Sequence, residues 1–149
     1  MCLYVNSPRL IAETDLIVYK CLRREPRLKN TYVTPMQGAM VAFGKNGKFH
    51  LRSGAKIMVI TNEFRNKTIH EGIHAYTYEY RAYALLPAYC EVFYAIIPKG
   101  RVYYLGFGAQ VVSSDMIIFR NKDSFNTYMA NHKVKEIDTS KKLSKDFVV

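Results

Sequence analysis

The sequence predicts an α+β domain that is mostly antiparallel sheet with one or two short helices. Short apolar runs rich in β-branched and aromatic residues recur along the chain, and turn residues separate them. Two stretches, 78–86 and 123–132, instead have the composition of short helices. The length of 149 residues and the hydrophobic content of 49% indicate one folded domain rather than a disordered chain.

The expected strands share an extended composition and are bounded by proline, glycine, asparagine or charged residues. In chain order they are residues 16–22, 31–34, 49–51, 55–60, 73–76, 90–97, 101–105 and 110–119. The stretch 36–43 fits either a strand or a short helix, and the last strand contains a candidate break at Ser113-Ser114-Asp115. Asn46-Gly47 predicts a turn, and Pro98-Lys99-Gly100 predicts a tight hairpin between the two strands that flank it.

The limits of the first helix and of the domain follow from the residues at their ends. Thr77 is placed to cap the N-terminus of the helix 78–86, and Pro87 ends it. Residues 1–132 are expected to form a single α+β domain. The segment 133–149 is polar and lysine-rich until its last residues, so we expect a frayed C-terminal tail.

The cysteines and the N-terminus bear on the cellular compartment. Cys2, Cys21 and Cys90 lie far apart and form no Cys-x-x-Cys pair, which indicates reduced thiols rather than a zinc ribbon or a redox pair. The first residues do not have the pattern of a signal peptide. No apolar run approaches the roughly 18 residues that a membrane-spanning helix needs. We therefore expect an intracellular protein without a membrane partner.

The positive charge is large and unevenly distributed. Lysine and arginine total 22 against 12 aspartate and glutamate, a formal net charge of +10, and residues 20–29 and 45–67 carry much of the excess. Such an excess attracts anionic partners, and basic side chains on loops bind phosphates without reading sequence. The expected partner is a nucleic acid, a nucleoprotein or an acidic protein surface. The residues expected to bind it are Lys20, Arg23, Arg24, Arg27, Lys29, Lys45, Lys48 and Arg52.

The run His70-Glu71-Gly72-Ile73-His74 matches the H-E-x-x-H pattern of zinc hydrolases. On a helix this spacing would place His70 and His74 on one face as zinc ligands, with Glu71 as the general base. Gly72 disfavours a helix, and the residues before it are polar. We therefore expect a turn at Glu71-Gly72 followed by the strand 73–76, with no bound metal or cofactor, and keep a zinc-dependent enzyme as an alternative.

Three stretches together resemble a small domain family of bacteriophages and Bacteroidota-type genomes. They are Glu-Gly-Ile-His-Ala-Tyr at 71–76, Ala-Ile-Ile-Pro-Lys-Gly-Arg-Val-Tyr-Tyr at 95–104 and Val-Val-Ser-Ser-Asp-Met-Ile-Ile at 111–118. The resemblance extends over residues 11–119 and implies a phage or mobile-element context, hence the cytoplasm of a bacterial host or a virion. It implies no particular activity.

A second, weaker resemblance is to ADP-ribosyltransferases. Gly-Ile-His-Ala-Tyr-Thr at 72–77, followed by Tyr-Arg-Ala-Tyr-Ala at 80–84, is similar to the Gly-x-Tyr-aromatic strand and the helix of that family. This chain has His74 where the family has tyrosine, and Asp115 is the acidic residue available in the later strands. The resemblance implies an ADP-ribosyltransferase-like fold with His74 at its site.

These observations favour a non-enzymatic accessory protein of a phage or mobile element. It would bind a nucleic acid or a nucleoprotein, including a host defence complex, through its basic residues. The alternatives are a virion structural component, or an enzyme of the ADP-ribosyltransferase-like or zinc-dependent class that uses His74 and Glu71.

Overall fold

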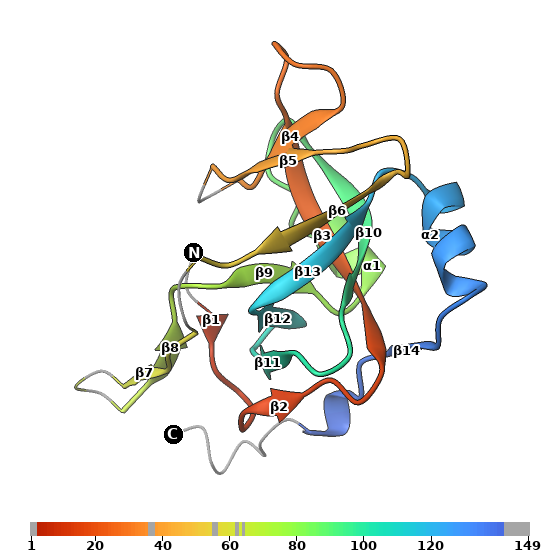
Figure 1. Cartoon of the computed structure of the whole chain (residues 1–149). Helices are drawn as coiled ribbons and strands as arrows, with labels where there is room; N and C mark the ends of the chain where they lie inside the picture. Colours follow the sequence, from red (N-terminus) through yellow and green to blue (C-terminus); the bar gives the residue numbers. More distant parts are fainter. Residues whose placement is uncertain (1–2, 36–37, 55–56, 62, 64, 142–149) are drawn as a thin grey trace.

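The computed structural model describes residues 3–35, 38–54, 57–61, 63 and 65–141 (Figure 1). It is mostly antiparallel sheet with two α-helices, α1 (Glu79–Ala84) and α2 (Lys122–Met129), and a short 3₁₀ helix at Thr139–Lys141. This confirms the mostly antiparallel sheet with two short helices that the sequence predicts.

The strands form one large and one small sheet. The larger, 11-stranded sheet consists of β2 (Leu10–Ile11), β3 (Asp15–Arg24), β4 (Thr31–Val33), β5 (Met40–Ala42), β6 (Lys48–Arg52), β9 (Ile73–Tyr76), β10 (Cys90–Ile97), β11 (Val102–Leu105), β12 (Gln110–Ser113), β13 (Asp115–Phe119) and β14 (Val134–Glu136). The 3-stranded sheet consists of β1 (Leu3–Tyr4), β7 (Ile60–Thr61) and β8 (Lys67–Ile69), in the order β1-β8-β7.

Strand β3 organises the larger sheet. The main path runs β2-β11-β12-β9-β3-β10-β13-β6, and β4 and β14 also pair with β3. Strand β3 pairs with β10 from Leu16 to Arg23, but it meets β9 only at the pair Tyr19–Tyr76. Strand β14 runs parallel to β3, while β3 is antiparallel to β4, β9 and β10. The centre of the sheet therefore has one long, well-paired strand whose contact with β9 is brief.

Strands on both sides of β3 share one hydrophobic core, so the sheet curves around it. Buried residues of this core come from nearly every strand of the larger sheet; among them are Val18, Leu22, Tyr32, Leu51, Ala75, Phe93, Leu105, Val111 and Ile118. A second cluster packs Leu3 and Ile69 of the small sheet against Tyr104 and Val112. A third packs Phe125 of α2 against Ile96 and Phe119.

Most of the expected strands are confirmed, and the ambiguous ones are resolved. The stretch 36–43 contains strand β5 and no helix in its described residues, and the stretch 110–119 divides at Ser114 into β12 and β13. The expected strand 55–60 is wrong over its described part, because 57–59 are irregular and only Ile60 enters β7; residues 55–56 lie outside the described part of the chain.

The expected hairpin around Pro98-Lys99-Gly100 is wrong, although the turn itself is present. Strand β10 lies between β3 and β13, whereas β11 lies between β2 and β12. The turn is held by the first residue of β3 and by the segment before it, because Lys99 N–H donates to Asp15 Oδ1 over 2.8 Å and Gly100 N–H donates to the Ala12 carbonyl over 2.7 Å. These bonds direct the chain across the core to β2 instead of back along β10.

The expected cap at Thr77 is also wrong. The N-cap residue of α1 is Tyr78, which makes no side-chain capping hydrogen bond. Thr77 is buried, and its hydroxyl donates to the carbonyl of Ala109 over 3.3 Å. Helix α2, by contrast, begins with a capping box in which Asn121 and Ser124 satisfy each other's backbone N–H groups.

The domain continues beyond residue 132. Strand β14 pairs with the first residues of β3, and Ile137 is buried in the main core. The frayed tail expected from residue 133 is therefore wrong for the described residues 133–138. No helix in the described part of the chain is long and apolar enough to cross a membrane.

Candidate functional site

The His-Glu-Gly-Ile-His run forms a turn and a strand, as expected, and is not helical. Glu71 and Gly72 form a bend, and β9 starts at Ile73. Gly72 has φ +105°, and a Cβ there would lie 2.8 Å from Val112 Cγ2, so glycine is required by both conformation and space. The helical spacing that the zinc alternative needs is absent, and the described residues contain no group of three or more His, Cys, Asp or Glu side chains able to hold a metal ion.

Lys20 is buried and structural, which corrects its assignment to an exposed binding surface. Its side chain is 7% exposed, and Nζ donates to the backbone carbonyl of His74 over 2.7 Å. This bond spans the place where β3 and β9 diverge beyond the pair Tyr19–Tyr76. Burial lowers the pKa of Lys20 to about 8.

The imidazole of His74 is half-buried on the β9 strand. Burial, and then the nearby Lys20 ammonium, lower the pKa of His74 to about 4, so the ring is neutral at physiological pH. Its Nε2 is buried and has no hydrogen-bond partner. Glu71 is exposed on the preceding bend.

The other basic residues predicted to bind a partner are exposed. Arg23 and Arg24 end β3, and Arg27 and Lys29 lie in the connection to β4. In this connection Arg27 Nε pairs with Glu25 Oε1 at 2.8 Å, and the Arg27 hydrogen bond lowers the pKa of that carboxyl.

The structure brings this connection next to the second basic segment. The N–H of Phe43 donates to the carbonyl of Asn30 over 3.0 Å, so the β3–β4 connection lies beside the chain that leads to Lys45. Lys48 and Arg52 follow on β6, together with His50. Because side chains alternate along a strand, these three project from the same face, while Leu51 enters the core.

Three further basic residues join this surface, and none of them was among the predicted binding residues, because all three lie far away in sequence. Arg120 N–H donates to the carbonyl of Gly47 over 2.7 Å, and its guanidinium lies 5.5 Å from the ring of Tyr32. Lys122 follows at the start of α2. Arg101 Nε lies 3.1 Å from Asp115 Oδ2 on the strand next to β6.

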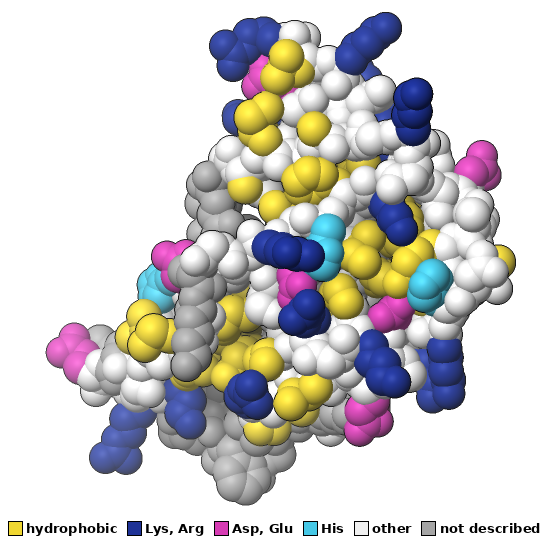
Figure 2. All heavy atoms as spheres, in the orientation of Figure 1, with side chains coloured by type: hydrophobic (Ala, Val, Ile, Leu, Met, Phe, Trp, Pro, Cys, Tyr) yellow, Lys and Arg dark blue, Asp and Glu magenta, His cyan; other side chains and the backbone are white. Residues whose placement is uncertain are grey.

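We define the basic face by the exposed or partly exposed cations of these segments: Arg23, Arg24, Arg27, Lys29, Lys45, Lys48, Arg52, Arg101, Arg120 and Lys122. Figure 2 shows lysine and arginine side chains at the top of the view, where the β3–β4 connection lies, and across the middle of the visible face. Strand β6 is at one end of the strand order, so its outer edge has no neighbouring strand on the main path of the larger sheet.

The carboxylate of Asp115 lies within the basic face but is buried and neutralised. Its side chain is 7% exposed, and Oδ2 lies 2.9 Å from His50 Nε2 and 3.1 Å from Arg101 Nε. Ser114 Oγ donates to Oδ1 over 2.9 Å. Arg52 Nη2 lies 3.4 Å from His50 Nδ1 and completes the cluster. Asp115 therefore fixes the orientation of the cations around it and presents almost no carboxylate surface.

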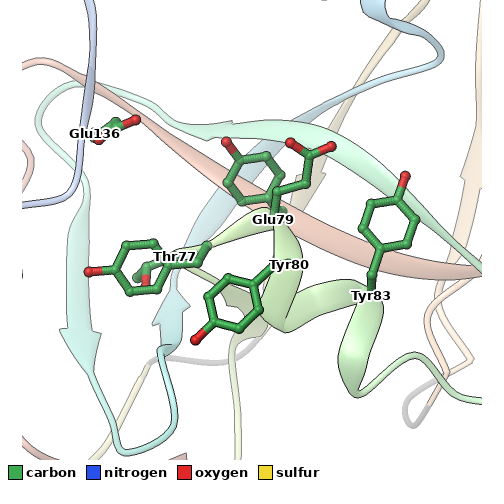
Figure 3. A pocket seen from close by; sticks show the side chains of 7 residues that line it. Thr77, Glu79, Tyr80, Tyr83 and Glu136 are labelled. Atoms are coloured by element: carbon green, nitrogen blue, oxygen red, sulfur yellow. The ribbon is translucent and has the colours of Figure 1, made fainter.

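A pocket of about 500 Å³ opens beside α1, and its lining is different in character. The residues that line it are Tyr19, Thr77, Tyr78, Glu79, Tyr80, Tyr83 and Glu136. Figure 3 shows Glu79, Tyr80 and Tyr83 projecting from α1, with Glu136 on the other side of the opening. None of the lining residues is basic.

Comparison of this chain with protein-family models, with curated proteins and with solved structures found no match.

Proposed function

We propose that this chain binds nucleic acid through the phosphate backbone, using the basic face, as an accessory protein of a phage or mobile element. The observation that carries the proposal is the convergence of cations from four separate chain segments, 23–29, 45–52, Arg101 and 120–122, on one surface beside β6. Lysine and arginine side chains neutralise phosphates and release counterions, which gives affinity without base readout.

The arrangement supports backbone binding better than base readout. Apart from Lys122, the basic side chains come from strands and loops, and the described residues include no long exposed helix able to enter a major groove. The neutralised Asp115 places no exposed carboxylate against phosphate. The phage context rests on the resemblance over residues 11–119 and is part of the proposal.

Fluorescence anisotropy with labelled single-stranded and duplex oligonucleotides tests this function. Lys48→Gln/Arg52→Gln removes two charges from the basic face, and Arg9→Gln/Lys67→Gln removes two exposed charges elsewhere. We expect the first variant to lose about tenfold in affinity or more at moderate salt, and the second to stay near the unmodified protein. Equal losses in both variants, or no binding by the unmodified protein at low salt, would contradict the proposal.

A second candidate function is favoured by the arrangement of β9 and α1. The residues that resemble ADP-ribosyltransferases, 72–77 and 80–84, form a strand followed by a helix, which is the order that the resemblance implies. Neutral His74 is on the same strand. Under this alternative the chain would bind NAD, and a nucleophile of an acceptor molecule would take the ADP-ribose group as the bond to nicotinamide breaks and nicotinamide leaves.

Calorimetric titration with NAD tests the alternative separately. Saturable heat that is lost in His74→Ala and retained in Lys48→Gln/Arg52→Gln would favour it. Absence of heat at millimolar NAD, with the His74→Ala protein still folded, would remove it.

A further inference from the structure

The pocket beside α1 contrasts with the rest of this positively charged chain. Glu79 and Glu136 bring two carboxylates to an opening lined otherwise by tyrosine rings and Thr77. The helix also carries Arg81, but that guanidinium is directed to the β11–β12 connection, where Nε donates to the carbonyl of Gly108 over 3.3 Å. The local charge of the pocket is therefore negative on a chain of net charge +10.

The tyrosine rings provide several exposed aromatic faces. Tyr78 and Tyr80 are stacked, with ring centroids 6.3 Å apart and planes inclined by 29°. Tyr80 is 70% exposed and Tyr83 57% exposed, so their rings are available to a ligand. Tyr19 lies deeper on β3, and burial, followed by Glu79, raises its pKa.

Aromatic faces beside carboxylates recognise organic cations. The quadrupole of a tyrosine ring attracts a cation that lies over its face, and a carboxylate adds charge complementarity. Guanidinium is the best match to this lining, because it is planar enough to stack on a ring and has paired donors for a carboxylate. Phosphates and nucleotides would meet two carboxylates and no cation from the lining.

We propose that this pocket binds the side chain of an arginine displayed by a partner polypeptide. The choice of a displayed side chain over a free small cation rests on the open rim, where Tyr78, Tyr80 and Tyr83 are each 46–70% exposed. Such a rim leaves room for a polypeptide backbone outside the pocket. The site is separate from the basic face and does not depend on nucleic-acid binding.

Calorimetry with short capped peptides tests the assignment. The probes are acetyl-Gly-Arg-Gly-amide, the same peptide with glutamate in place of arginine, and tetramethylammonium chloride as a free cation. Salt at about 0.15 M shortens the reach of the chain's overall positive charge to about 8 Å. We expect the arginine peptide to bind saturably, the glutamate peptide not to bind, and tetramethylammonium to bind more weakly than the arginine peptide.

Two exposed substitutions in the pocket have matched controls. Tyr80→Leu and Glu136→Gln are each expected to lower the affinity for the arginine peptide about two- to fivefold, because each removes one group that contacts the cation at an exposed site. Tyr4→Leu and Glu63→Gln, which alter an exposed tyrosine and an exposed glutamate elsewhere, should leave its affinity unchanged.

Three results would overturn the proposal. The first is no saturable binding of the arginine peptide to the folded protein. The second is an equal effect of the pocket variants and their controls. The third is tighter binding of tetramethylammonium than of the arginine peptide, which would assign the pocket to a free cation. Loss of nucleic-acid binding in Lys48→Gln/Arg52→Gln has no bearing on these outcomes, so the two proposals fail independently.

Discussion

The ammonium group of Lys20 donates a 2.7 Å hydrogen bond to the backbone carbonyl of His74, between two strands that pair only at Tyr19 and Tyr76. This side-chain bond takes the place of a backbone hydrogen bond between the strands where β3 and β9 separate. It also places a titratable cation among buried groups, because Lys20 is 7% exposed. The stability of the domain should therefore respond to pH through this lysine.

Alkaline pH should stabilise the domain through Lys20. Burial lowers the pKa of Lys20 from its ordinary value of 10.5 to about 8 in the folded protein, so the unfolded chain binds more protons between these limits. Lys20 therefore increases the free energy of unfolding as pH rises from about 8 to about 10.5, by an amount on the order of 2–4 kcal/mol. Tyrosines ionise over the same range, so the measured quantity is the difference in urea unfolding between the unmodified protein and Lys20→Met. A difference that does not change with pH would contradict the burial of the Lys20 ammonium.

Acid pH should destabilise the domain through His74. The pKa of His74 is lowered from 6.5 to about 4, so the unfolded chain binds a proton here before the folded chain does. This contribution is present above pH 6.5 and is lost as pH falls towards 4. His74→Gln should remove it, as measured by the difference between the two unfolding free energies at pH 7, 5.5 and 4.5. An NMR titration that gave His74 an ordinary pKa would show that the ring is not desolvated.

The turn before β9 should not tolerate a side chain at Gly72. Gly72→Ala places a Cβ at φ +105° and 2.8 Å from Val112 Cγ2, and we expect it to lower the free energy of unfolding by about 1–3 kcal/mol or more. Gly100→Ala is the matched control, because Gly100 has φ +87° but nothing within 4 Å of the added atom. Chemical denaturation of both variants separates the two causes. Equal losses would mean that backbone strain, and not contact with β12, is what requires glycine at this turn.

Replacing Asp115 with asparagine should lower the stability of the domain and raise its affinity for nucleic acid. Asp115→Asn removes the charge that Arg101 and His50 share, so we expect a loss of about 1–3 kcal/mol in unfolding free energy. The same change makes the basic face more positive, which should raise the affinity for an oligonucleotide at low salt. The opposite effect of Lys48→Gln/Arg52→Gln provides the comparison. Unchanged affinity in a folded Asp115→Asn protein would place the binding surface elsewhere.

Local sequence patterns predicted the strands well and their pairing less well. The apolar run at 90–97 coincides with β10, and Gly72 correctly indicated a turn before β9. The hairpin after β10 could not be excluded from its turn residues. The two strands do not pair with each other because Lys99 and Gly100 donate hydrogen bonds to residues more than eighty positions earlier in the chain.

Net charge indicated a basic surface, but its members depend on the tertiary fold. Composition does not distinguish Lys20 from its basic neighbours. On β3, however, Lys20 lies two residues from both Val18 and Leu22, so its side chain is on the core side of the strand. That alternation was the signal that could have identified it. Arg101 and Arg120 join the basic face through long-range contacts to Asp115 and Gly47, which no local pattern reports. The pocket beside α1 combines residues of β3, α1 and β14 and was likewise not predicted.

The salt dependence of oligonucleotide binding tests the central proposal most directly. Affinity for a single strand should fall linearly on a double-logarithmic plot against salt, and each phosphate contact removed should flatten the slope by about 0.7. We therefore expect Lys48→Gln/Arg52→Gln to have a slope shallower by about 1.4, while Arg9→Gln/Lys67→Gln keeps the slope of the unmodified protein. A slope that is the same in all three proteins, or close to zero in the unmodified one, would contradict binding through the basic face.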